Sequence, residues 1–312
     1  MTTTSDETPV IKPPPRLGRA IRRNPIALKE LRGRMRGSRA FIVLTVYVVL
    51  MSLFTVVLYM IYAASSSVTL STTGGVIGKV IFAGVVAIEL FLVCFVAPAF
   101  TAGAISGERE RRTFHLLRTT LLPAHRIVIG KLISALAYIV LLLLVAVPLQ
   151  SLAFLMGGIT IEEVILSVEI LLVTAIGYGA IGIFFSAVTK RTLVASILTY
   201  TFALLVTIAL PLGAGIIGLF SPTNLGYYNR PLAEAFVSYL YTLVAATNPV
   251  SAAIGTEVIL QQNGTAFYYV DVLSNGVSIP MLSPWIVFTV FYLLLTLILV
   301  LVTVNHVRRI EQ

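Results

Sequence analysis

Long apolar runs separated by short polar segments make up most of this chain. Six runs reach the length of about 20 residues that a helix needs to cross a hydrocarbon core of about 30 Å. They occupy Ala40–Ala63, Val80–Ala104, Leu132–Met156, Val164–Val188, Leu193–Phe220 and Trp285–Asn305. The fifth run is long enough to tilt, or to contain a break near Pro211 and the glycines that follow it. The pattern predicts an all-α integral membrane protein with six transmembrane helices.

Composition and charge extend this prediction to the orientation in the membrane. The chain is 58% hydrophobic and 11% charged, whereas soluble domains carry about 25% charged residues. Apart from Lys79 and Arg230, every Lys and Arg precedes the first run, follows the sixth, or lies between runs two and three or four and five. Cytoplasmic segments retain such residues, so both termini are predicted to be cytoplasmic. Orientation and attraction to anionic lipids explain the net charge of +9, and nucleic acid is not expected as a partner.

The region before the first run divides into two parts. Residues 1–23 are rich in Thr, Pro and charge, which is typical of a flexible cytoplasmic tail. Asn24-Pro25 is a helix start signal, and residues 24–39 then form an amphipathic helix that we expect in the membrane interface, in contact with lipids. A basic flank that only orients the chain is the alternative. Residues 40–312 form the six-span domain. The helix has an apolar sector (Ala27, Leu28, Leu31, Met35) beside a basic stripe (Lys29, Arg32, Arg36, Arg39).

A charged segment interrupts the pattern between the second and third runs. Ser106 is the predicted N-cap of a short helix, and Glu108 and Glu110 fall in its first turn, where the helix dipole favours carboxylates. Pro123 ends this helix and starts the next. We expect a helix over residues 107–121 that lies across the membrane face; a solvated loop whose arginines only set the orientation is the alternative. The helix would carry an apolar stripe of Phe114, Leu117 and Leu121.

Three polar side chains within the runs are candidates for a transport pathway. Glu89 lies near the middle of the second run, where a charge costs roughly 2.5 to 3.5 kcal/mol. The apolar residues around it contribute about −4 to −7 kcal/mol on the same scale, so insertion of this segment into the membrane is still favourable. A carboxyl group that faces a transport cavity would justify this cost. A protonated carboxyl group whose hydrogen bond only stabilises the packing of two helices would justify it equally well. Gln150 and Glu169 are expected to face the same cavity.

The external segment over residues 221–284 is too long for a simple link. It predicts two short apolar helices, one opening at Pro231 and one resuming after Asn248-Pro249, which dip into the outer leaflet or cap the spans. Alternation around Asn275-Gly276 predicts a small hairpin.

Two stretches of this sequence resemble the permease subunits of type-2 ABC transporters. They are "NPIALKELRGRMRGSRAF" before the first span and "AGAISGERERRTFHLLRTTLLPAHRIVIGK" after the second. Those subunits carry an alanine-proline pair near the end of span two, then Glu-Arg-Glu, a threonine, a leucine pair, a proline and Gly-Lys. The matching positions are Ala97, Pro98, Glu108, Arg109, Glu110, Thr113, Leu116, Leu117, Pro123, Gly130 and Lys131.

The resemblance implies a division of labour between chains. The sequence has no Gly-x-x-x-x-Gly-Lys-Ser/Thr motif, so no cofactor is expected on this chain, and ATP and Mg would bind a separate ABC ATPase. In the family, the loop over residues 105–130 docks on that ATPase, short re-entrant helices lie between spans five and six, and two permeases pair with two ATPases in an exporter of the inner (cytoplasmic) membrane. The second permease is a copy of this chain or a related one. The residues implied in ATPase coupling are Lys29, Glu30, Arg32, Glu108, Arg109, Glu110, Arg111, Thr113, Phe114 and Leu117.

Two other classes of function were weighed. An intramembrane hydrolase needs a nucleophile and a base within the spans, and the sequence has no Gly-x-Ser-x-Gly or His-Glu-x-x-His motif. An ion-coupled secondary transporter that uses Glu89 would need no ATPase and is the alternative; inverted internal repeats would support it, and none is evident.

Overall fold

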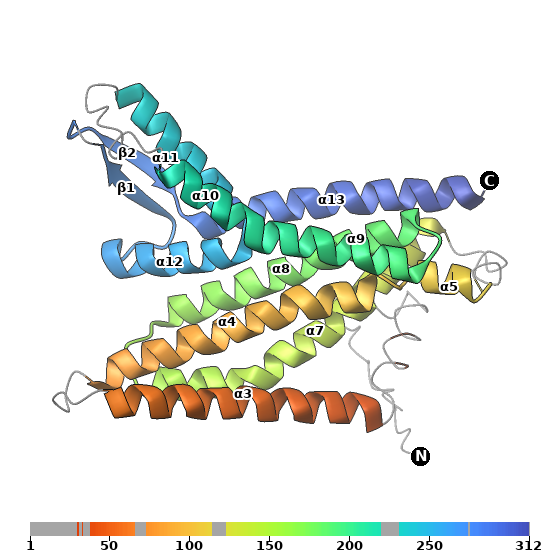
Figure 1. Cartoon of the computed structure of the whole chain (residues 1–312), viewed down its shortest axis with the longest axis horizontal. Helices are drawn as coiled ribbons and strands as arrows, with labels where there is room; N and C mark the ends of the chain where they lie inside the picture. Colours follow the sequence, from red (N-terminus) through yellow and green to blue (C-terminus); the bar gives the residue numbers. More distant parts are fainter. Residues whose placement is uncertain are drawn as a thin grey trace, which may run out of the picture.

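The computed structural model describes residues 30, 33, 38–65, 73–113, 123–219, 231–273 and 275–311. Within them, six helical stretches are long and apolar enough to cross a membrane, as predicted. They run side by side along one direction (Figure 1). Their helices are α3 (Ser38–Ser65), α4 (Thr73–Thr101), α7 (Ala124–Leu155), α8 (Ile161–Val188), α9 (Thr192–Leu204) with its continuation, and α13 (Pro284–Glu311).

The helix α8 forms the centre of the bundle. It packs against α4, α7, α9, α12 and α13, and its middle residues belong to the largest buried apolar cluster. Small residues allow this close packing: Gly177 lies against the ring of Tyr292, and Gly182 lies against Thr101. A Cβ atom at either glycine would overlap its neighbour. A capping box fixes the start of the helix, because Thr160 and Glu163 exchange hydrogen bonds with each other's backbone N–H.

The fifth span is interrupted as the sequence predicted, but by a widened turn rather than a break. The helix α9 passes through a π-helical turn, η1 (Leu205–Ala209), into α10 (Leu210–Leu219). Pro211 has no N–H, so the carbonyl of Thr207 loses its helical donor. The Asn248 side chain, which is fully buried, supplies a substitute: its Nδ2 donates to the carbonyl oxygens of Thr207 and Val206, at 3.0 and 2.6 Å.

The two helices that follow the fifth span confirm the predicted break at Asn248. The helices α11 (Pro231–Ala246) and α12 (Pro249–Asn263) meet at an angle of 119°. The Oδ1 atom of Asn248 accepts hydrogen bonds from the N–H groups of Val250 and Ser251 and so caps α12. One asparagine therefore joins this elbow to the fifth span.

The predicted hairpin is also present. The strand β1 (Tyr268–Val272) pairs antiparallel with β2 (Ser278–Leu282), and Gly276 supplies a positive φ of 80° in the turn. The hairpin and α11–α12 lie at one end of the molecule (Figure 1). The start of α3, the end of α13 and the short helix α5 (Ser106–Glu110) lie at the other.

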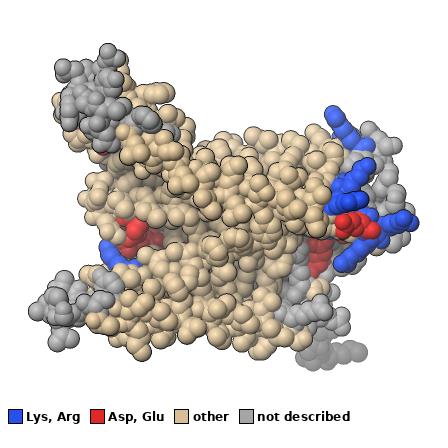
Figure 2. All heavy atoms as spheres, viewed as in Figure 1, with Lys and Arg blue, Asp and Glu red and all other residues tan. Residues whose placement is uncertain are grey.

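Charged side chains gather at the two ends and leave an apolar band between them. Figure 2 shows Lys, Arg, Asp and Glu at the α5 end and a smaller group at the opposite end. Such a band is what a multi-pass membrane protein requires, because charged side chains are costly within the hydrocarbon core.

Candidate functional site

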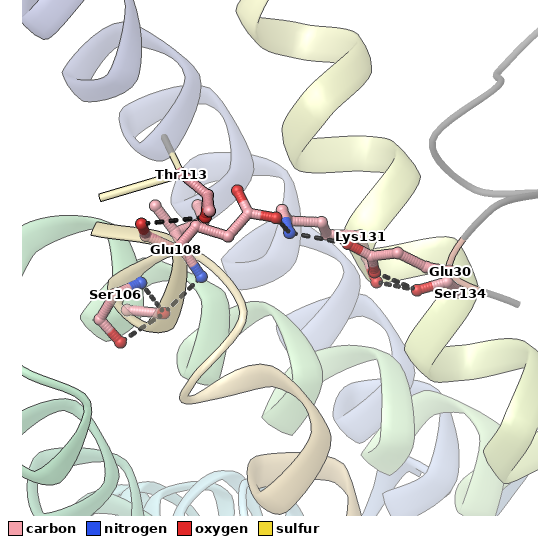
Figure 3. Close-up of polar contacts among 8 residues, drawn as sticks. Glu30, Ser106, Glu108, Thr113, Lys131 and Ser134 are labelled. Atoms are coloured by element: carbon pink, nitrogen blue, oxygen red, sulfur yellow. Dashed lines mark hydrogen bonds and ion pairs between the residues drawn. The ribbon is translucent and has the colours of Figure 1, made fainter. Parts of the chain in front are cut away.

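A buried lysine organises the charged end of the molecule. Lys131 lies in the second turn of α7, which begins directly after Pro123 as the sequence predicted. Its Nζ atom forms ion pairs with Glu30 Oε1 and Glu108 Oε1, both at 2.7 Å (Figure 3). The hydroxyl of Ser134 donates to Glu30 Oε2 at 2.9 Å. Only 2% of Lys131 is exposed, so a single ammonium group holds the pre-span residue Glu30 and the loop after span two against α7.

The start of α5 is fixed to the end of α8 through one serine. The backbone N–H groups of Ile105 and Ser106 both donate to Ser186 Oγ, at 2.9 and 3.0 Å. The prediction that Ser106 is an N-cap was wrong. Ile105 occupies the N-cap position with a helical backbone, because a turn leads from α4 directly into α5 without an extended residue. The Ser106 hydroxyl instead lies within hydrogen-bond distance of Ala102 O and Ser186 Oγ, both 3.2 Å away.

The next two charged residues of α5 hold the connection between α8 and α9. Arg109 Nη1 donates to the carbonyl oxygens of Ala187 and Thr189, at 2.7 and 3.3 Å. These are C-terminal carbonyls of α8 that lack helical partners, and a cation suits the negative end of the helix dipole. The Glu110 carboxylate accepts from the N–H of Thr192, at 2.9 Å, and from its hydroxyl. Glu110 thereby caps α9, because the side chain of its own N-cap residue, Arg191, makes no capping hydrogen bond.

The helix α5 is shorter than the sequence suggested. It ends at Glu110, and Arg112 then takes a φ of 55°, which leaves the right-handed helical path. The N–H of Thr113 folds back to the carbonyl of Glu108 at 3.0 Å. A continuous helix over residues 107–121 was therefore a wrong prediction. Arg111, Arg112 and Thr113 are exposed. The predicted anchors and basic partners Phe114, Leu117, Lys29 and Arg32 lie outside the described residues.

The predicted pathway residues separate into two places. Gln150 Nε2 of α7 donates to Glu89 Oε2 of α4 at 2.7 Å, and Glu89 is 1% exposed. The other oxygen of this carboxyl group, Oε1, is buried without a hydrogen-bond partner among the described residues. Glu169 of α8 instead faces α13, where the Thr289 hydroxyl lies 2.5 Å from its Oε1. A pathway role for these residues remains a prediction.

The comparison with protein families decides what kind of chain this is. The profile of the ABC-2 family transporter protein matches residues 24–309, nearly the whole chain. The chain belongs to the ABC-2 transporter family. A comparison with curated proteins gave no match. Permeases of this family are membrane components that work with an ABC ATPase and have no nucleotide-binding domain of their own. The family therefore does not favour an ion-coupled carrier.

In this permease, the sequence identified the loop but not its internal partners. It left open whether Glu108 and Glu110 bind the ATPase or the pre-span helix; in the structure they bind Lys131 and Thr192. The sequence did draw attention to Lys131, because this residue ends the Gly-Lys match to the family. It did not indicate what the lysine binds. No sequence pattern pointed to Ser186 or Thr192. Each lies about 80 residues from its partner in the loop, and only the fold brings such positions together.

Proposed function

We propose that this permease is the membrane subunit of an ATP-driven exporter, and that a separate ABC ATPase docks on the loop over residues 105–130. The observation that carries the proposal is the set of contacts around α5. Lys131 joins this segment to α7, and Arg109 and Glu110 join it to the ends of α8 and α9. Since α4 runs into α5, a displacement applied to the loop reaches four spans at once.

The exposed part of the loop supplies the contact surface in this proposal. Arg111, Arg112 and Thr113 are exposed, whereas Glu108, Arg109 and Glu110 make the internal contacts. The coupling role thus divides between internal contacts and exposed residues. Phe114 and Leu117, which follow in the sequence, are proposed to take part in the same contact with the ATPase. Glu30, with Lys29 and Arg32 beside it in sequence, frames the same contact from the pre-span helix.

The wider assembly is part of the same proposal. Two copies of the permease, or this chain and a related permease, pair with two ATPases in the inner membrane, with both termini in the cytoplasm. ATP and Mg bind the ATPases, and the cargo moves outward. The charge asymmetry in Figure 2 supports this orientation, because Lys and Arg concentrate at the α5 end. The 119° elbow of α11 and α12 supports re-entrant helices at the outer face, since neither helix alone spans a bilayer.

Site-directed cross-linking tests the docking surface. Cys94 is the only cysteine, so a Cys94→Ser background accepts single new cysteines. Arg111→Cys lies at the tip of the loop, and Glu162→Cys, equally exposed at the start of α8, is the matched control at the opposite end. With a bifunctional maleimide in native membranes, Arg111→Cys should cross-link to a protein that hydrolyses ATP, and the yield should change on adding nucleotide. Equal cross-linking of that protein to both positions, or to neither, would refute docking at the loop.

Glu89, Gln150 and Glu169 are proposed to lie along the transport pathway. The buried Oε1 of Glu89 supports this, since it has no hydrogen-bond partner among the described residues and could accept a hydrogen bond from a passing polar group. Glu89→Gln keeps the shape and the contact with Gln150 but removes the ionisable carboxyl group. Cargo-stimulated ATP hydrolysis should fall in this variant; activity equal to that of the unmodified protein at every pH would exclude the pathway role.

A further inference from the structure

A cavity lies at the end of the molecule opposite to the coupling loop. It has a volume of about 260 Å³ and lies between α4, α8 and α12. Most of its wall is aliphatic or aromatic, including Phe82, Leu90 and Ile170. This volume is slightly below the usual range of about 300 to 1,000 Å³ for small-molecule sites. The cavity is therefore large enough for one ring or one short alkyl chain.

The wall of this cavity carries two carboxylates. Glu163 of α8 and Glu257 of α12 both line it, and they lie close enough to repel each other electrostatically. Lys79 offsets part of the charge of Glu163, but neither carboxylate has an ion-pair partner within 4 Å among the described residues. The partners of Glu163 are the capping-box groups, and Glu257 accepts from the neutral amide of Gln261 at 2.6 Å. An excess of negative charge thus borders an apolar cavity.

A hydroxyl group in the wall also lacks a partner. Thr256, next to Glu257 in α12, also lines the cavity and is 2% exposed. Its Oγ1 is buried and makes no hydrogen bond within the described part of the chain. Buried hydroxyls are normally satisfied, and an unsatisfied one costs about 1–3 kcal/mol. The cavity lining thus includes a residue whose hydroxyl group the described part of the chain leaves unsatisfied.

We propose that this cavity binds a small cationic amphiphile, an amine or quaternary ammonium that carries one ring or one short alkyl chain. The apolar body packs against the wall formed by α4 and α8, and the cation lies beside the carboxylates of Glu163 and Glu257. Two chains of a bilayer lipid do not fit the volume, so the ligand is a water-borne amphiphile rather than a membrane lipid. The inference concerns binding alone and does not depend on the ATPase or on export.

Binding of radiolabelled decyltrimethylammonium to the full-length permease in phosphatidylcholine nanodiscs tests the proposal. Binding should be saturable, displaced by excess unlabelled probe and not by decyl sulfate or decanol. Glu257→Gln, which is nearly isosteric, should weaken binding about tenfold or more, because it removes one of the two carboxylates that attract the cation. Ala253→Phe should abolish it by filling the cavity. Lys79→Gln should tighten it, because it removes the competing positive charge.

The matched control is Glu162→Gln, which removes an exposed carboxylate next to Glu163 that does not line the cavity. This variant should bind like the unmodified protein. Equal affinity of Glu257→Gln and Glu162→Gln, or equal displacement by decyl sulfate, would overturn the proposal. Displacement by phosphatidylethanolamine added to the nanodiscs would also overturn it, since the site would then belong to a lipid. Gel filtration checks that each variant is folded, and the conservative Glu257→Gln change keeps the test decisive if Ala253→Phe aggregates.

Discussion

Replacing Lys131 with methionine tests whether the buried ammonium group holds Glu30 and the loop after the second span against α7. Methionine has nearly the same length and fills the same space, so the change removes charge without opening a large cavity. It leaves the carboxylates of Glu30 and Glu108 without their common partner.

The size of the effect follows from the burial of the three side chains. Removing one partner of a fully buried ion pair costs about 3–5 kcal/mol. The Lys131 side chain is 3% exposed, but the side chains of Glu30 and Glu108 are 22% and 26% exposed, so both regain part of their hydration when the lysine is lost. We therefore expect Lys131→Met to lower the free energy of unfolding by about 2–3 kcal/mol, which is less than the cost for a fully buried ion pair. Glu108→Gln, which keeps the second pair, should cost about 1 kcal/mol.

Equilibrium unfolding in mixed micelles of dodecyl maltoside and SDS measures these differences. Lys190→Met is the matched control, because it makes the same replacement at an exposed position between α8 and α9. A double-mutant cycle with Lys131→Met and Glu108→Gln isolates the pair, and contacting residues of this kind couple by about 0.5–3 kcal/mol. A loss equal to that of Lys190→Met, or a coupling energy of zero, would refute the claim that this ion pair fixes the loop.

Three further predictions concern other contacts. Asn248→Ala removes the donor to two carbonyls of the fifth span and the cap of α12, and should lower the unfolding free energy by about 2–4 kcal/mol in the same micelle assay; an effect below 0.5 kcal/mol would contradict this. Gly182→Ala should destabilise the bundle because the new methyl group overlaps Thr101, whereas Gly213→Ala, with open space around it, should be neutral or stabilising by about 0.5–1 kcal/mol; equal effects would show that the helices rearrange. Glu110→Gln, which weakens the cap of α9, should leave ATP hydrolysis by the partner intact and lower cargo transport in proteoliposomes, and a parallel fall of both activities would argue against a coupling role.

The sequence predicted the parts of this fold that repeat a strong pattern. The six spans, the break at Asn248-Pro249 and the turn at Asn275-Gly276 all depend on local signals, namely apolar length, a capping asparagine before proline and a glycine with positive φ.

The parts that sequence reasoning missed depend on contacts between distant positions. The motif around Glu108 and Glu110 favoured a long helix, because acidic residues in a first turn and an apolar stripe are local helix signals. In the structure these carboxylates instead bind Lys131 and Thr192, and the positive φ of Arg112 marks a turn that ends the helix early. No periodicity within the loop could indicate partners supplied by α7 and α9.

The connection between α8 and α9 consists of residues 189–191 alone. Three residues span at most about 10 Å when fully extended, and Arg109 and Glu110 already hold the two helix ends that they join. The connection therefore has no slack with which to absorb a movement. A displacement of α5 must therefore shift the fourth and fifth spans together. A flexible insertion of glycine and serine after Lys190 would let the two spans move independently while leaving each of them intact.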